Sequence, residues 1–379
     1  MKRMTRFSLV RVRMALALVA ALAWAGCSTQ EGGPTEPGAS ASLSGQQPDF
    51  GAAIAIHQRH TYELIGLPGV AGTAVGLTSD GRPAVKIYTE AASVPGLPER
   101  LEGIPVVVEV TGKFIAKPET ARNSETRTAS ACTIHTCSNT SVWPLPVPIG
   151  VSTSSNAILE DYCFSGTISA RVKNAAGAIY ALSNNHVYAL MNTVPLGTAI
   201  LQPGLADTQC SPTGSNDIGV LSAYAPIAFC KGWRGNHCPS NTIDAAIALS
   251  KKTELGNATP PAGYGAPSSK TVTAFVGQAV EKYGRTTSLT TGVITGIDAS
   301  VKVSYLTGTA LFVGQLLVGS CPSTCIGAGD SGSLLVTNDR SGNHNPVGLV
   351  FAGNSSGSLA IANQIGPVLS YFGVAVDGK

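Results

Sequence analysis

From Ile149 to the C-terminus, the sequence is a succession of short apolar runs separated by turns rich in Gly, Asn and Pro. Short strands with regular turn signals are typical of antiparallel β-barrels. Only 12% of the residues are charged and 43 are glycine, which also favours a β-rich, loop-rich secreted protein. We therefore expect a mainly β fold with barrels over residues 149–379.

The apolar runs predict the individual strands of these barrels. They are Ser165–Val172, Ile179–Leu182, Asp217–Tyr224, Thr242–Leu249, Thr271–Val276, Gly292–Ile297, Val301–Tyr305, Leu334–Val336 and Val347–Gly353. Lys251–Lys270 contains paired prolines and three glycines, so it is expected to cross from one barrel to the next. The tail, Ala362–Phe372, is expected to be helical.

One glycine-rich turn has the composition of a nucleophile loop. Ser331 lies in the sequence I-G-A-G-D-S-G-S of residues 326–333, directly before an apolar strand. A serine hydroxyl needs a base to take its proton, and attack on a carbonyl creates an oxyanion that N–H groups must stabilise. Glycines let the backbone turn its N–H groups inward. We predict Ser331 as the nucleophile, with the N–H groups of Gly329 and Ser331 as the oxyanion hole.

A base and an orienting carboxylate can be assigned from the same reasoning. His186 directly follows the predicted strand 179–182. Asp244 lies inside an apolar run, where an unpaired carboxylate would be costly to bury. We predict that His186 takes the proton of Ser331 and that Asp244 orients the imidazole.

Two rival assignments are less favourable. Asp217 follows Ser215 and Asn216, which suggest a turn, so this carboxylate is expected to cap a strand. A second G-x-S-x-G sequence occupies residues 353–357, but an α/β-hydrolase elbow needs its histidine downstream. No histidine follows His344, so that alternative fails.

The order His, Asp, Ser is the chymotrypsin order. With G-D-S-G-S at 329–333, the chain resembles the trypsin-like (chymotrypsin-fold) serine peptidases over roughly residues 150–372. S-N-N-H-V, I-D-A-A-I-A and K-Y-G-R-T-T at 282–287 are similar to a bacterial branch related to the plant narrow-leaf trypsin-like proteins. The resemblance implies two six-stranded-type antiparallel barrels with His and Asp in the first and Ser in the second.

The activity that the resemblance implies is that of a serine endopeptidase, which hydrolyses protein or peptide substrates through an acyl-enzyme. No cofactor and no metal are expected. Members of this fold that are activated by a released N-terminus begin with I-V-G-G, and no such start occurs near residue 150, so we do not expect that route. The alternative function is a catalytically silent, protease-fold binding or scaffold protein of the cell envelope, because fold alone does not determine function.

Substrate specificity can be predicted from the segments that wall the side-chain pocket in the resembled fold. These are residues 320–328, just before the nucleophile, and residues 347–353, on a strand after it. Neither contains Asp, Glu, His, Lys or Arg. A buried charge without a partner is costly, so we predict cleavage after uncharged residues, small or medium apolar ones first.

The N-terminus has the features of a secretion signal. Five basic residues within the first thirteen precede an apolar run, Met14–Ala25, that is too short to span a bilayer. The sequence A-G-C that ends at Cys27 resembles a bacterial lipobox, although Trp24 stands where Leu is preferred. We therefore expect residues 1–27 to be a lipoprotein-type signal, with Cys27 as the lipidation site and the protein anchored in the bacterial cell envelope. Ordinary cleavage after Ala25 and secretion is the alternative.

Cysteine parity supports the lipoprotein prediction. The chain has nine cysteines, and assigning Cys27 to a lipid leaves an even number for disulfides. Short spacing favours three local pairs, and elimination leaves a fourth, although eight cysteines allow 105 pairings. The pairs are Cys132–Cys137, Cys230–Cys238, Cys321–Cys325 and Cys163–Cys210. For Cys132 and Cys137, a disulfide is favoured over a zinc site in an oxidising compartment.

Between the signal and the barrels we expect three segments. Residues 28–48 are rich in Gly, Ser, Pro and Gln and are predicted to be a flexible tether. Residues 49–117 are predicted to be a small α/β module, and residues 118–148 a linker that is polar and then Pro-rich. The module is a candidate pro-region that assists folding or covers the cleft. The net charge of +3 comes largely from the first thirteen residues, so no nucleic acid is expected. The oligomeric state cannot be predicted.

Within the module, Phe50–Ile65 is predicted to be a helix capped by Asp49, followed by a hairpin of strands at 69–77 and 83–88. A helical turn is expected at Leu97–Leu101 and a further strand at 103–110. His57 and His60 are three residues apart on the helix, so a metal pair is conceivable. Solvent-facing histidines are the preferred interpretation, since no further ligand lies nearby in the sequence.

The lipid anchor gives a first testable prediction. Replacing the acylated thiol, Cys27→Ser, should move the protein from the membrane fraction to the soluble envelope fraction or the medium. Cell fractionation and mass spectrometry of the mature N-terminus measure this. A wild-type chain that starts at Gly26 without lipid would end the lipoprotein interpretation.

Overall fold

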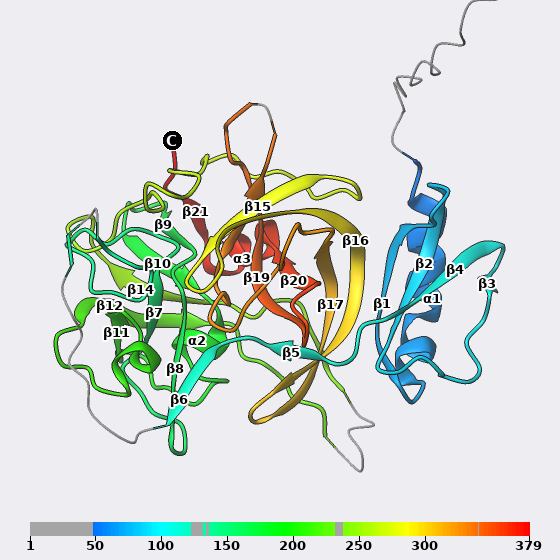
Figure 1. Ribbon diagram of the computed structural model, residues 1–379, viewed down its shortest axis with the longest axis horizontal. Coiled ribbons are helices and arrows are strands. Elements are labelled where there is room, and N and C mark those ends of the chain that lie inside the picture. The colour runs from blue at the N-terminus through cyan, green and yellow to red at the C-terminus, as the bar shows by residue number, and fades with distance from the viewer. Residues whose placement is uncertain (1–47, 123–131, 134–135, 232–237, 340) are drawn as a thin grey trace, which may run out of the picture. The chain divides into compact units, whose positions relative to one another are not determined.

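The structure is a computed structural model that describes residues 48–122, 132–133, 136–231, 238–339 and 341–379 (Figure 1). The predicted signal, Cys27 and the predicted tether lie outside the described residues. Within the described ranges, no helix has the length and apolar character needed to span a membrane.

The module begins with a helix packed on a sheet. Helix α1 (Gly51–Gly66) packs on the hairpin of β1 (Val70–Leu77) and β2 (Pro83–Thr89) through a core that includes Ile56, Leu64, Val85 and Ile87. Strand β4 (Ile104–Val110) adds to β2 in parallel. The predicted helix, hairpin and third strand are thus confirmed. The predicted helical turn at Leu97–Leu101 is wrong, because β3 (Arg100–Leu101) pairs with β4 across a tight turn.

Two polar predictions for α1 have different outcomes. The Asp49 carboxylate accepts a hydrogen bond from the Gly51 N–H at 2.8 Å, at the start of the helix as expected. His57 is buried, so its predicted exposure is wrong. Its Nε2 lies 2.9 Å from Thr73 Oγ1 on β1, and its Nδ1 lies 3.2 Å from Asp298 Oδ2 on β16 (Ser288–Tyr305). His60 is partly exposed and contacts Glu102 at 2.9 Å. The sheet under α1 therefore determines which histidine is covered.

The second barrel contains six antiparallel strands and is closed. Its order is β15 (Ala279–Gly284), β16 (Ser288–Tyr305), β17 (Gly308–Gly319), β20 (Ala360–Gln364), β19 (Pro346–Asn354) and β18 (Leu334–Thr337), and β18 pairs with β15 to complete the circle. The predicted strands 292–297 and 301–305 form one strand, β16, with register shifts. Thr271–Val276 is not a strand, and β17 was not predicted.

The first barrel is an antiparallel sheet of β9 (Ala170–Asn174), β10 (Ile179–Ser183), β14 (Ala246–Ser250), β12 (Asn216–Tyr224), β11 (Ala199–Gln202), β7 (Ser152–Ser155) and β8 (Tyr162–Thr167), in that order. The predicted strand 165–172 is divided between β8 and β9, and the predicted strand 242–249 begins only at Ala246. Asp244 therefore lies in the loop before β14. The mainly β fold with two chymotrypsin-like barrels is confirmed.

Short elements complete the two barrels. They are α2 (Asn185–Tyr188), the 3-10 turn η1 (Leu205–Thr208), β13 (Ser240–Asn241), α3 (Ile365–Phe372) and β21 (Val374–Val376). The predicted C-terminal helix is confirmed from Ile365, but the residues before it form β20. One buried apolar cluster joins side chains of both barrels, including Leu182 and Ile247 of the first and Leu334 and Leu349 of the second. The barrels are therefore packed directly against each other.

The sheet does not break between the module and the second barrel. Strand β1 pairs antiparallel with β16, so β1, β2, β4 and β3 extend the sheet of the second barrel (Figure 1). The chain then continues through β5 (Phe114–Ala116) and β6 (Glu119–Arg122). Residues 118–148, predicted as a linker, thus begin with a strand that pairs with β8.

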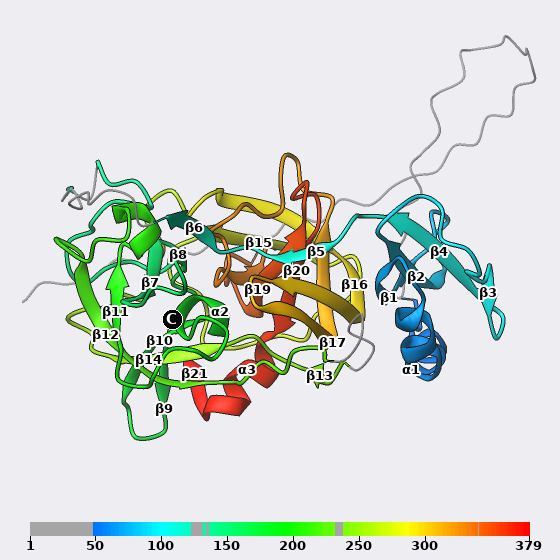
Figure 2. The same ribbon diagram turned by 90° about the horizontal axis from the view of Figure 1, so that it is seen from below.

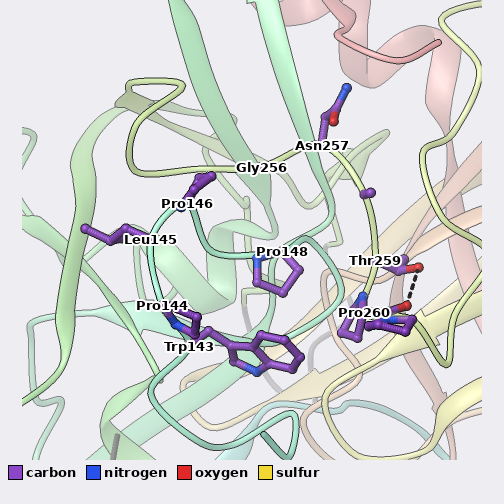
Figure 3. A pocket seen from close by; sticks show the side chains of 11 residues that line it. Trp143, Pro144, Leu145, Pro146, Pro148, Gly256, Asn257, Thr259 and Pro260 are labelled. Carbon is purple, nitrogen blue, oxygen red and sulfur yellow. Dashed lines mark hydrogen bonds between the residues drawn. The ribbon is translucent and has the colours of Figure 1, made fainter. Parts of the chain in front are cut away.

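The Pro-rich part of residues 118–148 packs on the crossover between the barrels. The Val147 N–H donates to Glu254 O at 2.9 Å, and the Gly256 N–H donates to Val147 O at 2.8 Å. Trp143, Pro146 and Pro148 line a pocket of about 400 Å³ together with Thr259 and Pro260 (Figure 3). None of the predicted catalytic residues lines this pocket.

All four predicted disulfides are confirmed. They are Cys132–Cys137, Cys163–Cys210, Cys230–Cys238 and Cys321–Cys325. The Cys163–Cys210 bond joins β8 to the segment after η1 inside a small apolar cluster with Leu201 and Leu205. Four disulfides indicate an oxidising, extracytoplasmic compartment.

Candidate active site

His186 and Asp244 are in direct contact. His186 lies on the short helix α2, immediately after β10, and Asp244 lies in the loop before the neighbouring strand β14. Asp244 Oδ2 lies 2.6 Å from His186 Nδ1. Asp244 Oδ1 accepts a hydrogen bond from the His186 backbone N–H at 3.1 Å. Both side chains are fully buried. This contact fixes the imidazole and directs its Nε2 away from Asp244.

The second barrel also holds the carboxylate of Asp244. The Tyr305 hydroxyl, at the end of β16, donates to Asp244 Oδ2 at 2.9 Å. Burial, and then the adjacent charge of Asp244, raise the pKa of Tyr305 well above its usual value, so this phenol stays protonated. The Asp244 N–H donates to Asn363 Oδ1 at 3.0 Å. Sequence patterns did not point to Tyr305 or Asn363, since both reach Asp244 from distant strands.

The loop that carries Ser331 docks on the first barrel. The Thr167 N–H, at the end of β8, donates to Ser331 O at 2.7 Å, and Thr167 Oγ1 donates to Gly329 O at 2.8 Å. A Cβ on Gly332, whose φ is +96°, would lie 2.2 Å from Thr167 O and 2.4 Å from Ser183 Oγ. Ser183 is close in sequence to His186, so the close approach that this glycine permits brings the Ser331 loop toward the histidine.

The hydrogen bond between Ser331 and His186 is not made in this structure. Ser331 Oγ donates instead to Phe351 O at 3.2 Å, and His186 Nε2 has no hydrogen-bond partner among the described residues. Both side chains are fully buried. In proteins without substrate, such catalytic hydrogen bonds are often long or absent and form only when substrate binds.

Gly329, whose N–H is predicted as an oxyanion donor, has a backbone conformation that favours glycine. Its φ is +93°, and an added Cβ would lie 2.6 Å from Arg285 Nη1 and 2.7 Å from Thr286 Oγ1, so glycine is required here. The Gly329 N–H donates to the carbonyl oxygen of Lys117 at 2.6 Å. A carbonyl of the same chain thus occupies one of the two predicted donors.

The K-Y-G-R-T-T sequence holds the residue beside Ser331. Asp330 is fully buried and accepts hydrogen bonds from Lys282 Nζ at 3.1 Å, Thr287 Oγ1 at 2.6 Å and the Gly327 N–H at 2.9 Å. The N–H groups of Thr286 and Thr287 also donate to it. Burial opposes ionisation of Asp330, but the Lys282 charge and these hydrogen bonds together hold its pKa below the usual value. Lys282 therefore supplies a cation at the nucleophile loop from within the chain.

The rival carboxylate is remote from these contacts. Asp217 lies exposed on β12, and its Oδ1 accepts from the Gly219 N–H at 3.4 Å. For metal binding, the described ranges contain no group of three or more His, Cys, Asp or Glu side chains that could hold an ion.

A cavity of about 490 Å³ lies beside the candidate site, between the two barrels. Phe164 and Met191 of the first barrel and Tyr305 of the second line it, and Tyr305 is the residue that binds Asp244. The segment at residues 113–120 forms another wall. His186, Asp244 and Ser331 do not line this cavity, so it adjoins the candidate site through Tyr305.

A family model described as the Nal1 C-terminal domain matches residues 267–377, a range that includes Lys282 and Ser331. No curated protein matches the chain.

Three solved structures with which the chain is similar are proteases by their printed names, and the first is called a serine protease. One is specific for glutamic acid and uses a histidine triad in substrate binding, with 20% identity, a TM-score of 0.42, and coverage of 61% of this chain and 100% of that chain. A Nocardiopsis protease has 19% identity, a TM-score of 0.41, and coverage of 61% and 99%. Protease A of Thermobifida fusca has 19% identity, a TM-score of 0.42, and coverage of 62% and 100%.

The buried pair of Lys282 and Asp330 gives a prediction for stability. Lys282→Met leaves a buried carboxylate without its cation and should lower the free energy of unfolding by about 3–5 kcal/mol at pH 7. Because the folded pKa of Asp330 lies below its unfolded value, the stabilisation is present above about pH 4 and is lost as the pH falls further. The deficit of the variant should therefore shrink below about pH 4, as urea unfolding at several pH values would measure.

A matched control removes a lysine from a more exposed pair. Lys173 Nζ contacts Asp377 at 2.9 Å, and Lys173 is about half exposed. Lys173→Met should cost about 1 kcal/mol or less, since Asp377 keeps its contact with Arg171. If Lys282→Met and Lys173→Met lost the same free energy of unfolding at pH 7, the buried pair of Lys282 and Asp330 would not be more stabilising than the exposed pair.

Proposed function

We propose that this protein is a serine endopeptidase that uses Ser331, His186 and Asp244. The observation that carries the proposal is the buried contact of His186 Nδ1 with Asp244 at 2.6 Å, which leaves His186 Nε2 available for a proton. The His186–Asp244 geometry is that of a base held by a carboxylate, and the proposal pairs this base with the serine of a glycine-rich turn. The Nal1 C-terminal domain match supports a place in the branch related to the plant narrow-leaf proteins.

The reaction follows from the roles of these groups. Ser331 Oγ turns from Phe351 O to His186 Nε2, loses its proton to the imidazole, and attacks the substrate carbonyl. The Asp244 carboxylate stabilises the His186 imidazolium, and the Tyr305 hydroxyl holds that carboxylate in place. The N–H groups of Gly329 and Ser331 stabilise the oxyanion. His186 then returns the proton to the leaving amine. Water hydrolyses the acyl-enzyme by the same route in reverse.

The cellular setting proposed is the bacterial cell envelope, with a lipid on Cys27. The four disulfides support an extracytoplasmic protein. The A-G-C sequence supports the anchor.

The nucleophile can be tested with a matched serine. A fluorophosphonate probe should label the wild type, and Ser331→Ala should abolish both labelling and peptide hydrolysis, lowering turnover by roughly 10⁶-fold. Ser355→Ala is the control, because Ser355 is an exposed serine in the second G-x-S-x-G sequence. Labelling and turnover unchanged in Ser331→Ala would reject the assignment. A protein that never labels, in the wild type or in variants that uncover Ser331, would favour the silent scaffold.

Specificity is a separate prediction. The segments 320–328 and 347–353 carry no charged side chain, so cleavage should occur after uncharged residues, small or medium apolar ones first. Cleavage of a mixed peptide library, read by mass spectrometry, measures this. Dominant cleavage after Arg or Lys would show that the pocket lies elsewhere.

A further inference from the structure

Residues 114–122, called the strap below, cross the candidate site in the way that a substrate would. The strap consists of β5, then Lys117 and Pro118, then β6. Figure 2 shows β5 and β6 in succession, the first beside the second barrel and the second beside the first barrel. The contacts of each part define what the strap occupies.

The first part of the strap adds a strand beside the nucleophile. Strand β5 pairs antiparallel with β19, with Ala116 opposite Ala352 and Ile115 opposite Gly353. The adjacent residue of β19, Phe351, supplies the carbonyl that accepts from Ser331 Oγ. Addition of an extended chain to a strand edge is a common mode of peptide recognition. Strand β5 therefore fills the edge along which a peptide substrate would pair.

The middle of the strap presents a peptide bond to the oxyanion donor. The Lys117 carbonyl oxygen accepts from the Gly329 N–H at 2.6 Å. A scissile carbonyl would point its oxygen at the same donor. The Lys117–Pro118 bond thus takes the place of the bond to be cut.

The second part of the strap continues on the other side. Strand β6 pairs antiparallel with β8, with Glu119 opposite Ser165 and Thr120 opposite Phe164. Glu119 also contacts Arg285 at 3.3 Å. The strap is therefore paired on both sides of the Lys117 carbonyl, and Ser331 and His186 are fully buried.

We propose that the strap is an internal substrate mimic that keeps the peptidase latent, and that an extended protein or peptide segment must displace it. This inference rests on the proposed function. The segment that displaces the strap must be an unfolded polypeptide that can pair with β19 and β8.

Two features of the strap oppose its own cleavage. Pro118 places a ring on the nitrogen of the bond, where an ordinary peptide carries only hydrogen. Among the described residues, the Lys117 side chain has no acidic partner, and its Nζ donates to Ser355 O at 3.4 Å. Burial lowers the pKa of the Lys117 ammonium, which is an unfavourable environment for the cation. The strap thus has an amide that is hard to cut and a side chain that binds weakly.

The first experiment loosens the strap in the full-length protein. Glu119→Lys replaces the contact with Arg285 by a like charge and should raise the rate of fluorophosphonate labelling at Ser331, and peptide turnover, by about tenfold or more. Glu254→Lys is the control, because Glu254 makes an exposed pair with Lys251 away from the strap. Thermal unfolding of both variants checks folding. The proposal would be overturned if the wild type, Glu119→Lys and Glu254→Lys were all labelled at the same rate.

The second experiment makes the strap cleavable and does not depend on loosening it. In the double variant Lys117→Ala, Pro118→Ala, which removes both features, Ser331 Oγ should bond to the carbonyl carbon of residue 117 as the bond to residue 118 breaks. The serine proton would pass through His186 to the new amine, and water would release Ser331. Mass spectrometry should then find a chain end at residue 117 and a new N-terminus at residue 118. Ser331→Ala in the same background should stay intact.

The outcomes separate the two proposals. An intact Lys117→Ala, Pro118→Ala chain, in protein whose Ser331 labels, would show that residue 117 is not held as a scissile residue and would overturn the inference alone. Absence of labelling in the wild type and in every strap variant would overturn the proposed peptidase function itself.

Discussion

The buried ammonium group of Lys282 supports the loop that carries Ser331. Asp330 is fully enclosed, next to Ser331, and removing its partner would leave a charge in the interior. Lys282 Nζ and Thr287 Oγ1 come from the same short segment of the second barrel, so the partner is built into the sequence. The nucleophile loop can therefore be ordered without a newly released N-terminus. This agrees with the lack of an I-V-G-G start near residue 150.

A second constraint acts at the junction of the two barrels. The Asp244 carboxylate takes hydrogen-bond donors from His186 in the first barrel and from Tyr305 in the second. The Ser331 loop belongs to the second barrel but binds Thr167 of the first. Each half of the candidate site is thus completed by the other half. A change in barrel packing would alter both the orientation of the base and the position of the nucleophile.

Local sequence patterns were sufficient for some features and not for others. Ser331, His186 and Asp244 could be chosen as candidates because each chemical role needs a particular residue type beside an apolar strand, and the structure brings His186 and Asp244 into contact. Three disulfides could be paired from short spacing. Tyr305 could not be found, because β16 brings it to Asp244 only after the barrel has closed. The burial of helix residue His57 depends on Thr73 of β1 and on Asp298 of β16, which is distant in sequence. The Lys117 contact was also beyond prediction, since a backbone carbonyl carries no sequence signal.

The continuous sheet between the module and the second barrel has a consequence for release of the site. Strand β1 pairs with β16, and β2 and β4 follow in the same sheet, so the chain just before the strap is attached to the second barrel by its own pairing. A cut after Lys117 would therefore leave residues 114–117 beside the site. A segment held by so short a connection has an effective local concentration of about millimolar. It would act as a tethered competitor, and an incoming chain would have to outbind it even when the covalent connection is gone.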